Sequence, residues 1–147
     1  MSDKILVSAC LFGEACRYDG KSQPCIDEKF LQWKKEGRLI PVCPERDGGL
    51  PIPRKPCELK NGRAVTADGK DMTDEYTRGA DIALRTAKEN GVKLCVLKSK
   101  SPSCGSGRIY DGSFTGTLTD GFGVAAKRLF DAGFDVVDET ALPTADI

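Results

Sequence analysis

The sequence predicts an α/β fold: a single-domain, Rossmann-like parallel sheet of about four strands with helices on both faces and a small hairpin insertion. Short apolar segments alternate with longer amphipathic segments along the chain, and this alternation favours a parallel sheet. The length of 147 residues suits one domain, residues 1–147. The composition, 39% hydrophobic and 30% charged residues, is ordinary for a globular protein.

Four segments have the composition of buried strands. The first, KILVS at residues 4–8, is short, apolar and β-branched. The second, RLIPVC at residues 38–43, contains Pro41, which favours an edge position because proline cannot donate a hydrogen bond to a neighbouring strand. VKLCVLKS at residues 92–99 and FDVVDE at residues 134–139 complete the predicted sheet.

Three helices are expected between these strands. Residues 27–37 place apolar side chains among charges and end in a glycine, as helices often do. Residues 73–91 form a long amphipathic segment for which Thr73 is the expected N-cap. The third helix is expected from about residue 121 to residue 133. The segment ELKNGRAVT, residues 58–66, contains an Asn-Gly pair that is typical of a small hairpin.

Charge and hydropathy exclude several classes of function. The formal net charge is zero and the sequence contains no basic block, so nucleic acid is not an expected partner. No apolar run approaches the length that spans a membrane, and the N-terminal apolar segment is too short for a signal peptide. We therefore expect a cytoplasmic protein with no membrane association.

Cysteine is the most informative residue type in this sequence. The chain contains no histidine, which removes the commonest general base and every histidine-containing zinc site. In a reducing cytosol, several cysteines indicate metal binding or catalysis rather than disulfides, although some can be small core residues. The chain has seven: Cys10, Cys16, Cys25, Cys43, Cys57, Cys95 and Cys104.

Three of these cysteines follow predicted strands. Cys10 comes just after the first strand, Cys43 ends the second, and Cys104 lies in the loop after the third. Ligands of open parallel sheets bind at the carboxyl ends of the strands, so we expect the three thiols to converge there. Three thiolates can hold an iron–sulfur cluster with one open iron, which is a Lewis acid, whereas a closed zinc site needs four ligands. The alternative from spacing alone is a mixture of buried and redox-active thiols.

The other four cysteines have simpler interpretations. Cys95 lies inside a predicted strand and is expected to be a core residue. Cys25 follows a proline and Cys57 is expected in a proline-rich loop, and both are interpreted as incidental. Cys16 stays open between a fourth ligand, a sulfur acceptor and a structural thiol.

Polar residues surround the three thiols at the strand ends. The segment SPSCGSG around Cys104 offers serine hydroxyls and backbone N–H groups that can bind thiolates, sulfide or an anion, although such turns are common. Glu45 lies two residues after Cys43. Without histidine, a carboxylate beside a metal is a candidate general acid or base, and the alternative is a solvated surface glutamate.

Four motifs in this order resemble the thiouracil desulfurase (TudS-like) family. They are VSACLFGEACRYDG, PVCPERDGGLPIPR, LKSKSPSCG and IYDGSFTGTLTDGFGVAAKRL, and the resemblance runs from residue 4 to about residue 139. It implies a [4Fe-4S] cluster held by Cys10, Cys43 and Cys104 with the fourth iron free. It also implies catalytic roles for Glu45 and Ser101.

The reaction that the resemblance implies is a hydrolytic, non-redox desulfuration. Sulfur is removed from a thiolated pyrimidine such as 2-thiouracil, giving uracil and hydrogen sulfide. The open iron would take the thiocarbonyl sulfur while water or hydroxide attacks the carbon. The expected partner is thus a small-molecule thiolated nucleobase, and a homodimer is the default expectation for assembly.

Two other functions are compatible with the same cysteines. A non-catalytic cytosolic metal-binding or redox-sensing module would use them without turnover, and a small zinc domain would hold a different metal. The sequence leaves open whether the substrate is a free thiobase, a thionucleoside or another thioamide.

Overall fold

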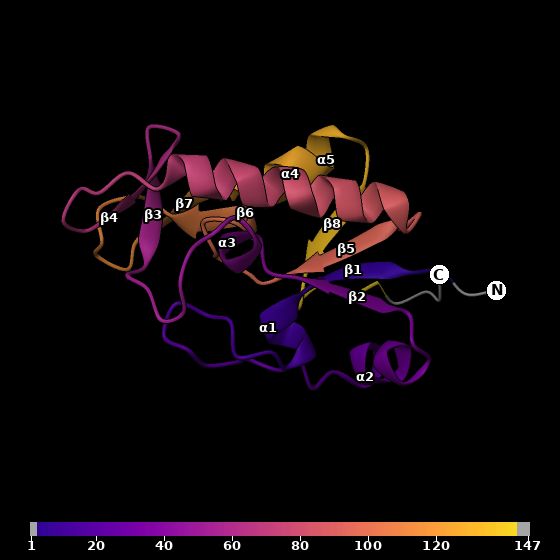
Figure 1. The fold of residues 1–147 in the computed structure, drawn as a ribbon. Helices are drawn as coiled ribbons and strands as arrows, with labels where there is room; N and C mark the ends of the chain where they lie inside the picture. The colour runs from indigo at the N-terminus through magenta and orange to yellow at the C-terminus, as the bar shows by residue number, and fades with distance from the viewer. Residues whose placement is uncertain (1–2, 144–147) are drawn as a thin grey trace.

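The computed structural model describes residues 3–143 and contains a central sheet of four parallel strands (Figure 1). The strands lie in the order β2 (Leu39–Val42), β1 (Ile5–Ser8), β5 (Leu94–Leu97) and β8 (Asp135–Asp138). Each neighbouring pair is parallel. The predicted α/β fold is confirmed, and β2 lies at an edge of the sheet, as Pro41 indicated.

Helices cover both faces of this sheet (Figure 1). On one face lie α4 (Thr73–Glu89) and α5 (Val124–Asp131), which pack against each other. On the other face lie α2 (Glu28–Lys35) and the short α1 (Ala9–Phe12). Both faces of the sheet are therefore buried, which explains why the strands are apolar without alternation.

Side chains of successive strand residues enter two separate cores. Ile5 and Val7 pack with Trp33 of α2 in the core on one face. Leu6 packs with Cys95 and the residues of α4 and α5 in the core on the other face. This division follows from the two-residue repeat of a strand. Cys95 is fully buried, so its interpretation as a core residue is confirmed.

The predicted hairpin is present as β3 (Cys57–Lys60) and β4 (Arg63–Thr66). Asn61 and Gly62 form its turn with φ angles of 52° and 77°. Both values are positive, as a two-residue turn between the strands of a hairpin requires. The Asn-Gly pair was therefore a reliable signal.

A second hairpin, β6 (Ser106–Tyr110) with β7 (Leu118–Phe122), was not predicted. The expected start of the third helix at residue 121 is wrong, because Gly121 pairs with Gly107 inside this hairpin. Helix α5 begins three residues later. Figure 1 shows both hairpins beyond the carboxyl ends of the sheet strands.

The expected capping role of Thr73 is also wrong. Thr73 is the first helical residue of α4, and Met72 occupies the N-cap without a side-chain hydrogen bond. The Thr73 Oγ1 atom instead accepts a hydrogen bond of 2.9 Å from the backbone N–H of Ala64. Thr73 thus ties the first hairpin to α4.

Helix α4 is in very close contact with α3 (Pro44–Asp47), the turn that follows β2. A Cβ atom on Gly79 would overlap the carbonyl group of Pro44. One on Gly48 would overlap the carbonyl oxygen of Glu75. These glycines allow the two backbones to touch, and this contact fixes the position of α3.

We therefore expect Gly79→Ala to destabilise the protein. Glycine-to-alanine changes inside helices usually stabilise by up to about 1 kcal/mol. Here the new methyl group must push α3 away, and overpacking of this kind costs roughly 1–3 kcal/mol. Chemical denaturation measures the change, with the exposed Arg85→Ala on the same helix as the control. A Gly79→Ala protein at least as stable as the wild type would contradict the close contact.

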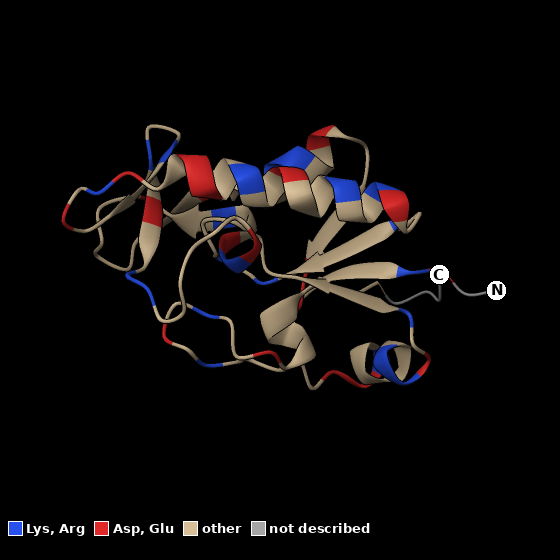
Figure 2. Ribbon diagram, in the orientation of Figure 1, with Lys and Arg blue, Asp and Glu red and all other residues tan. Residues whose placement is uncertain are grey.

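Charges of both signs are interspersed along the ribbon (Figure 2). Helix α4, for example, carries Asp74 and Glu75 in its first turn and Lys88 in its last. Among residues 3–143, no helix is both long enough and apolar enough to cross a bilayer. The expectation that nucleic acid is not a partner stays a prediction.

Candidate active site

A cavity of about 560 Å³ lies at the carboxyl ends of β1, β2 and β5. Its walls include the residues that directly follow these strands. The volume is within the range of ordinary ligand cavities, and the place is where open parallel sheets bind ligands. All five residues singled out from the sequence line it: Cys10, Cys43, Glu45, Ser101 and Cys104.

The three strand-end thiols come from three different parts of the fold. Cys10 lies in α1, Cys43 is the N-cap residue of α3, and Cys104 lies in the turn before β6. Each is at least nine-tenths buried in the protein. The structure thus brings these thiols to one cavity, while their role as ligands stays a prediction.

Two further cysteines reach the same cavity. Cys57 begins β3 instead of lying in a loop, and it lines the cavity near Tyr76. The interpretation of Cys57 as incidental therefore leaves out its place on the cavity wall. Cys16 also lines the cavity and neighbours Cys43, whose Sγ is 3.7 Å from the carbonyl oxygen of Cys16. Cys25 is buried in the core beside α2.

The arrangement of these donors differs from that of a single-ion site. Within residues 3–143, no three Cys, Asp or Glu side chains lie close enough together to hold one metal ion. A zinc site needs all of its thiolates around one ion. An iron–sulfur cluster binds thiolates through different irons, so they can stand farther apart. Three free thiols around one cavity, in a chain without histidine, fit such a cluster.

The three thiols differ in their readiness to ionise. A hydrogen bond from the Cys16 thiol lowers the pKa of Cys43 below its usual value. Burial, followed by the nearby Cys43, raises the pKa of Cys10 to about 11. Burial raises the pKa of Cys104 to about 12, although a hydrogen bond with Ser8 opposes this effect. Metal binding at Cys10 and Cys104 must therefore displace protons.

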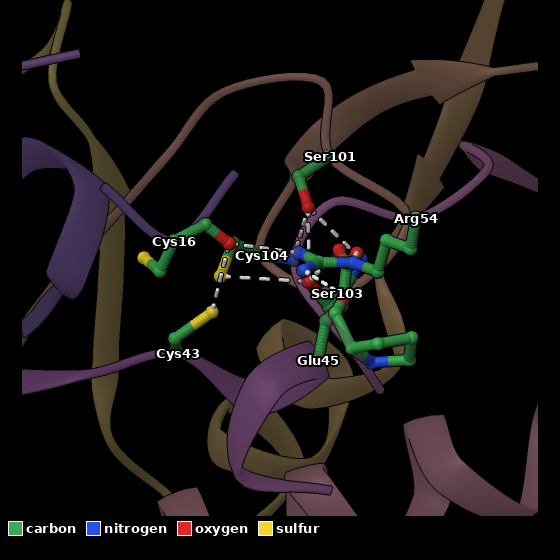
Figure 3. Close-up of polar contacts among 8 residues, drawn as sticks. Cys16, Cys43, Glu45, Arg54, Ser101, Ser103 and Cys104 are labelled. Carbon is green, nitrogen blue, oxygen red and sulfur yellow. Dashed lines mark hydrogen bonds and ion pairs between the residues drawn. The ribbon is translucent and has the colours of Figure 1, made fainter. Parts of the chain in front are cut away.

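Cys16 is thus placed to act through Cys43. The same thiol–thiolate hydrogen bond that lowers the pKa of Cys43 raises the pKa of Cys16. Its carbonyl oxygen also accepts a hydrogen bond of 3.0 Å from Nη2 of Arg54 (Figure 3). Of the three interpretations left open by the sequence, these contacts favour the structural thiol.

Glu45 lies in the first turn of α3, and its carboxylate is held from two sides (Figure 3). Its Oε1 atom accepts a hydrogen bond of 3.0 Å from Nε of Arg54. Its Oε2 atom accepts one of 2.8 Å from the hydroxyl of Ser103. The Glu45 side chain is only 14% exposed. It is therefore not the solvated surface glutamate of the alternative interpretation.

Arg54 was not predicted from the sequence, yet it connects several parts of the site. Its side chain is 7% exposed and pairs with Glu45. It also donates to the carbonyl oxygens of Cys16 and Pro51, and its backbone N–H donates to the carbonyl oxygen of Tyr18. One guanidinium group thus fixes both the carboxylate and the loop that carries Cys16.

A chain of hydroxyl groups leads from Ser101 to Glu45. The Oγ atom of Ser101 accepts hydrogen bonds from the backbone N–H groups of Ser103 (3.1 Å) and Cys104 (3.0 Å). The two serine hydroxyls are 3.0 Å apart. Because a carboxylate only accepts, Ser103 donates to Glu45, and Ser101 must then donate to Ser103. Ser103 is buried and was not singled out from the sequence.

The loop after β5 is also held from the far edge of the sheet. Glu139, just beyond β8, accepts hydrogen bonds from the backbone N–H and the hydroxyl of Ser99, at 2.8 and 2.9 Å. It also pairs with Lys98 at 3.0 Å, and Lys98 lines the cavity. These contacts fix the start of the segment that carries Ser101 and Cys104.

Comparison with known proteins identifies the family. A model of the 2-thiouracil desulfurase family matches residues 5–141. YbbK of Bacillus subtilis (strain 168), an uncharacterized protein, is 41% identical over 148 residues, 94% of this chain and 97% of YbbK. A solved structure described as the [4Fe-4S]-dependent thiouracil desulfidase TudS matches with a TM-score of 0.94 and 44% identity, covering 97% of this chain and 94% of that one. This chain therefore belongs to the 2-thiouracil desulfurase family.

Proposed function

We propose that this chain is a [4Fe-4S]-dependent desulfurase that hydrolyses 2-thiouracil to uracil and hydrogen sulfide, with residues 1–147 acting as one domain. The observation that carries the proposal is that Cys10, Cys43, Cys104 and the Glu45 carboxylate line one cavity. The name of the matching solved structure, a [4Fe-4S]-dependent thiouracil desulfidase, supports it.

In this proposal Cys10, Cys43 and Cys104 hold the cluster. When bound by three thiolates, such a cluster supplies one open iron, a Lewis acid with affinity for a sulfur atom. The thiol of Cys16 lies beside Cys43 and lowers the pKa of this proposed ligand, which favours its ionisation when the cluster binds. Arg54 holds the segment that carries Cys16 in place.

Glu45 is the proposed general base. An ionised carboxylate offers about four lone pairs, and Arg54 and Ser103 each engage one of its two oxygens. The lone pairs that remain can accept a proton from the water that attacks the thiocarbonyl carbon. Because Arg54 and Ser103 fix both oxygens, the base needs no rearrangement before it reacts.

Ser101 and Ser103 form the proposed path by which the proton returns. Their hydrogen bonds run in one direction, from Ser101 through Ser103 to Glu45. Once Glu45 has taken a proton, it can donate to Ser103, and the two hydroxyls then turn so that Ser103 donates to Ser101. A proton can then leave from Ser101, which lines the cavity. The departing sulfur and the ring nitrogen are the groups that need it. Water supplies both protons of the hydrogen sulfide and the oxygen of uracil, so the reaction balances without a redox partner.

We expect Ser103→Ala to keep its iron and lose turnover, because the substitution separates Ser101 from Glu45 and leaves all three proposed ligands in the chain. The substitution also removes the contact of 3.8 Å between the Ser103 hydroxyl and the Cys104 thiol, so iron content must be measured directly. Loss of assisted proton transfer lowers rates by roughly 10²–10⁴-fold. Iron content and turnover are measured together. Ser106→Ala, a substitution in β6 outside the cavity, is the matched control and should behave as wild type. A Ser103→Ala enzyme with normal iron and a normal rate would remove Ser103 from the proton path.

Turnover under anaerobic conditions tests the proposed function itself. Protein loaded with iron and sulfide should convert 2-thiouracil to uracil and release sulfide in equal amounts, while metal-free protein should not. A non-catalytic sensor that uses the same cysteines would hold a cluster and leave 2-thiouracil unchanged.

The free state of all seven cysteines supports a reducing, cytosolic location. A homodimer remains part of the proposal on general grounds alone.

A further inference from the structure

The proposed mechanism leaves part of the cavity without a role. Besides the thiols and the Glu45 group, the walls contain Tyr110 and Phe114 from the second hairpin, Glu58 from β3, and Pro56 just before β3. Strands β3 and β6 of the two hairpins contact each other, and both hairpins lie beyond the carboxyl ends of the sheet strands (Figure 1). Two aromatic residues and a proline give this part of the wall an apolar character. We refer to this part of the wall as the hairpin end of the cavity.

Phe114 occupies an unusual backbone conformation there. Its φ angle is 58°, in the left-handed region that bulky residues avoid. A non-glycine residue persists in this region only when its surroundings enforce it, and such residues gather at functional sites. The backbone conformation of Phe114 therefore costs free energy, which other contacts of the loop must offset.

Glu58 provides such contacts. One carboxylate oxygen, Oε1, accepts hydrogen bonds from the backbone N–H groups of Gly112 (3.0 Å) and Phe114 (3.1 Å). Gly112 lies so close to the first hairpin that a Cβ atom there would stand 2.8 Å from the carbonyl oxygen of Leu59. The loop is thus pressed against β3 and held by Glu58. The backbone of Phe114 is therefore anchored where this residue lines the cavity.

We propose that the hairpin end is the subsite for the flat, unsaturated ring of the substrate, with Phe114 stacking on the ring face. This inference rests on the proposed function and deepens it, because it names the feature of the substrate that the cavity recognises. A planar aromatic ring and a phenylalanine face make a favourable stack that tolerates different ring substituents. A phenylalanine with an anchored backbone loses little conformational freedom when it binds, which adds to affinity.

Two ligands that differ only in ring saturation test this assignment. Uracil and 5,6-dihydrouracil carry the same carbonyl and N–H groups, but the saturated ring is puckered and has no continuous π face. Isothermal titration calorimetry on the cluster-loaded protein measures both affinities and does not depend on turnover. We expect the wild type to bind uracil roughly 5- to 140-fold more tightly than dihydrouracil, the range of one base–aromatic stack.

Variants then assign the discrimination to Phe114. Phe114→Leu should lose most of the preference for uracil, whereas Phe130→Leu, which removes an exposed ring on α5, should keep it. Glu58→Ala should act like Phe114→Leu because the loop is released. Glu58→Gln keeps an acceptor oxygen for the two N–H groups and should stay near wild type. Comparison of Glu58→Ala with Glu58→Gln separates the effect of the anchoring hydrogen bonds from the effect of the Glu58 charge.

The assignment is overturned if the wild type binds both ligands equally or binds neither at millimolar concentration. It is also overturned if Phe114→Leu retains the full preference for uracil. Failure of the proposed function looks different. In that case the cluster-loaded protein leaves 2-thiouracil intact while the uracil preference and its loss in Phe114→Leu persist. Normal turnover with an unchanged KM in Phe114→Leu would sink the subsite and leave the function standing.

Discussion

Replacing Cys10, Cys43 or Cys104 by alanine will remove most of the bound iron and all measurable turnover of 2-thiouracil. Each substitution takes away one of the three thiolates that line the cavity, and three are the fewest that the proposed cluster can use. Cys25 and Cys95 cannot compensate, because they are buried in the cores on the two faces of the sheet and do not line the cavity. Iron and acid-labile sulfide per chain, together with the visible absorption spectrum, report the loss.

The other cysteines provide the controls for this experiment. Cys25→Ala, Cys57→Ala and Cys95→Ala should bind iron at close to the wild-type level, because none of these thiols follows a strand end in the sheet. Cys95→Ala also removes a buried side chain, so its unfolding should be followed to separate stability from iron content. A Cys43→Ala protein that stays brown and active would refute the ligand assignment. Cys16, its neighbour, would then be the first replacement to test.

Replacing Glu45 by alanine will leave the cluster in place and lower turnover by roughly 10²–10⁴-fold, the usual contribution of one proton-transfer group. Glu45 contacts Arg54 and Ser103 but is not one of the proposed ligands. Glu45→Gln is the sharper variant, since the amide keeps the shape and one acceptor oxygen but is a far weaker base. Arg54 loses its charged partner in both variants, so folding is checked by thermal unfolding.

Glu14→Ala is the matched control for Glu45. Glu14 pairs with Arg46 of the same turn at 2.7 Å but does not line the cavity. Its removal should leave iron content and turnover unchanged. If Glu45→Gln turned over 2-thiouracil at the wild-type rate with a full cluster, another group would have to activate the water.

The sheet and the meeting of the thiols could be predicted because both follow from local pattern. Apolar β-branched segments predicted the strands, and Pro41 indicated an edge, where its missing N–H has no cost. Once the strands are parallel, their carboxyl ends must share one edge of the sheet. The residues that follow them, Cys10 and Cys43 among them, are then neighbours without further information.

The rest of the site depends on contacts that no local pattern encodes. Arg54 lies in the proline-rich segment of residues 51–56. It reaches Glu45 and Cys16 only because the fold brings this segment beside α3 and the Cys16 loop. Ser103 resembles any serine of a turn until the fold places it 2.8 Å from Glu45, 58 positions away in the sequence. Ser101 entered through the family resemblance, since its own turn contacts are equally ordinary.

The elements that were missed have similar causes. Helices α1 and α3 have four residues each, too few to show a helical repeat. Strands β6 and β7 contain Gly107 and Gly121 and exposed charged residues, so their apolar residues do not form the continuous run that marked the sheet strands. They are stabilised by pairing with each other and by the contacts of their connecting loop with Glu58.

The central claim is that water replaces sulfur at the thiocarbonyl carbon in the cavity formed by Cys10, Cys43, Cys104 and Glu45. Turnover of 2-thiouracil in water enriched in oxygen-18, without oxygen and without any reductant, tests it most directly. We predict that the uracil formed carries the label at the carbon that lost sulfur, that sulfide appears in equal amount, and that the rate scales with the iron content of the protein. Unlabelled uracil, a requirement for a reductant, or equal activity in iron-free protein would contradict the account.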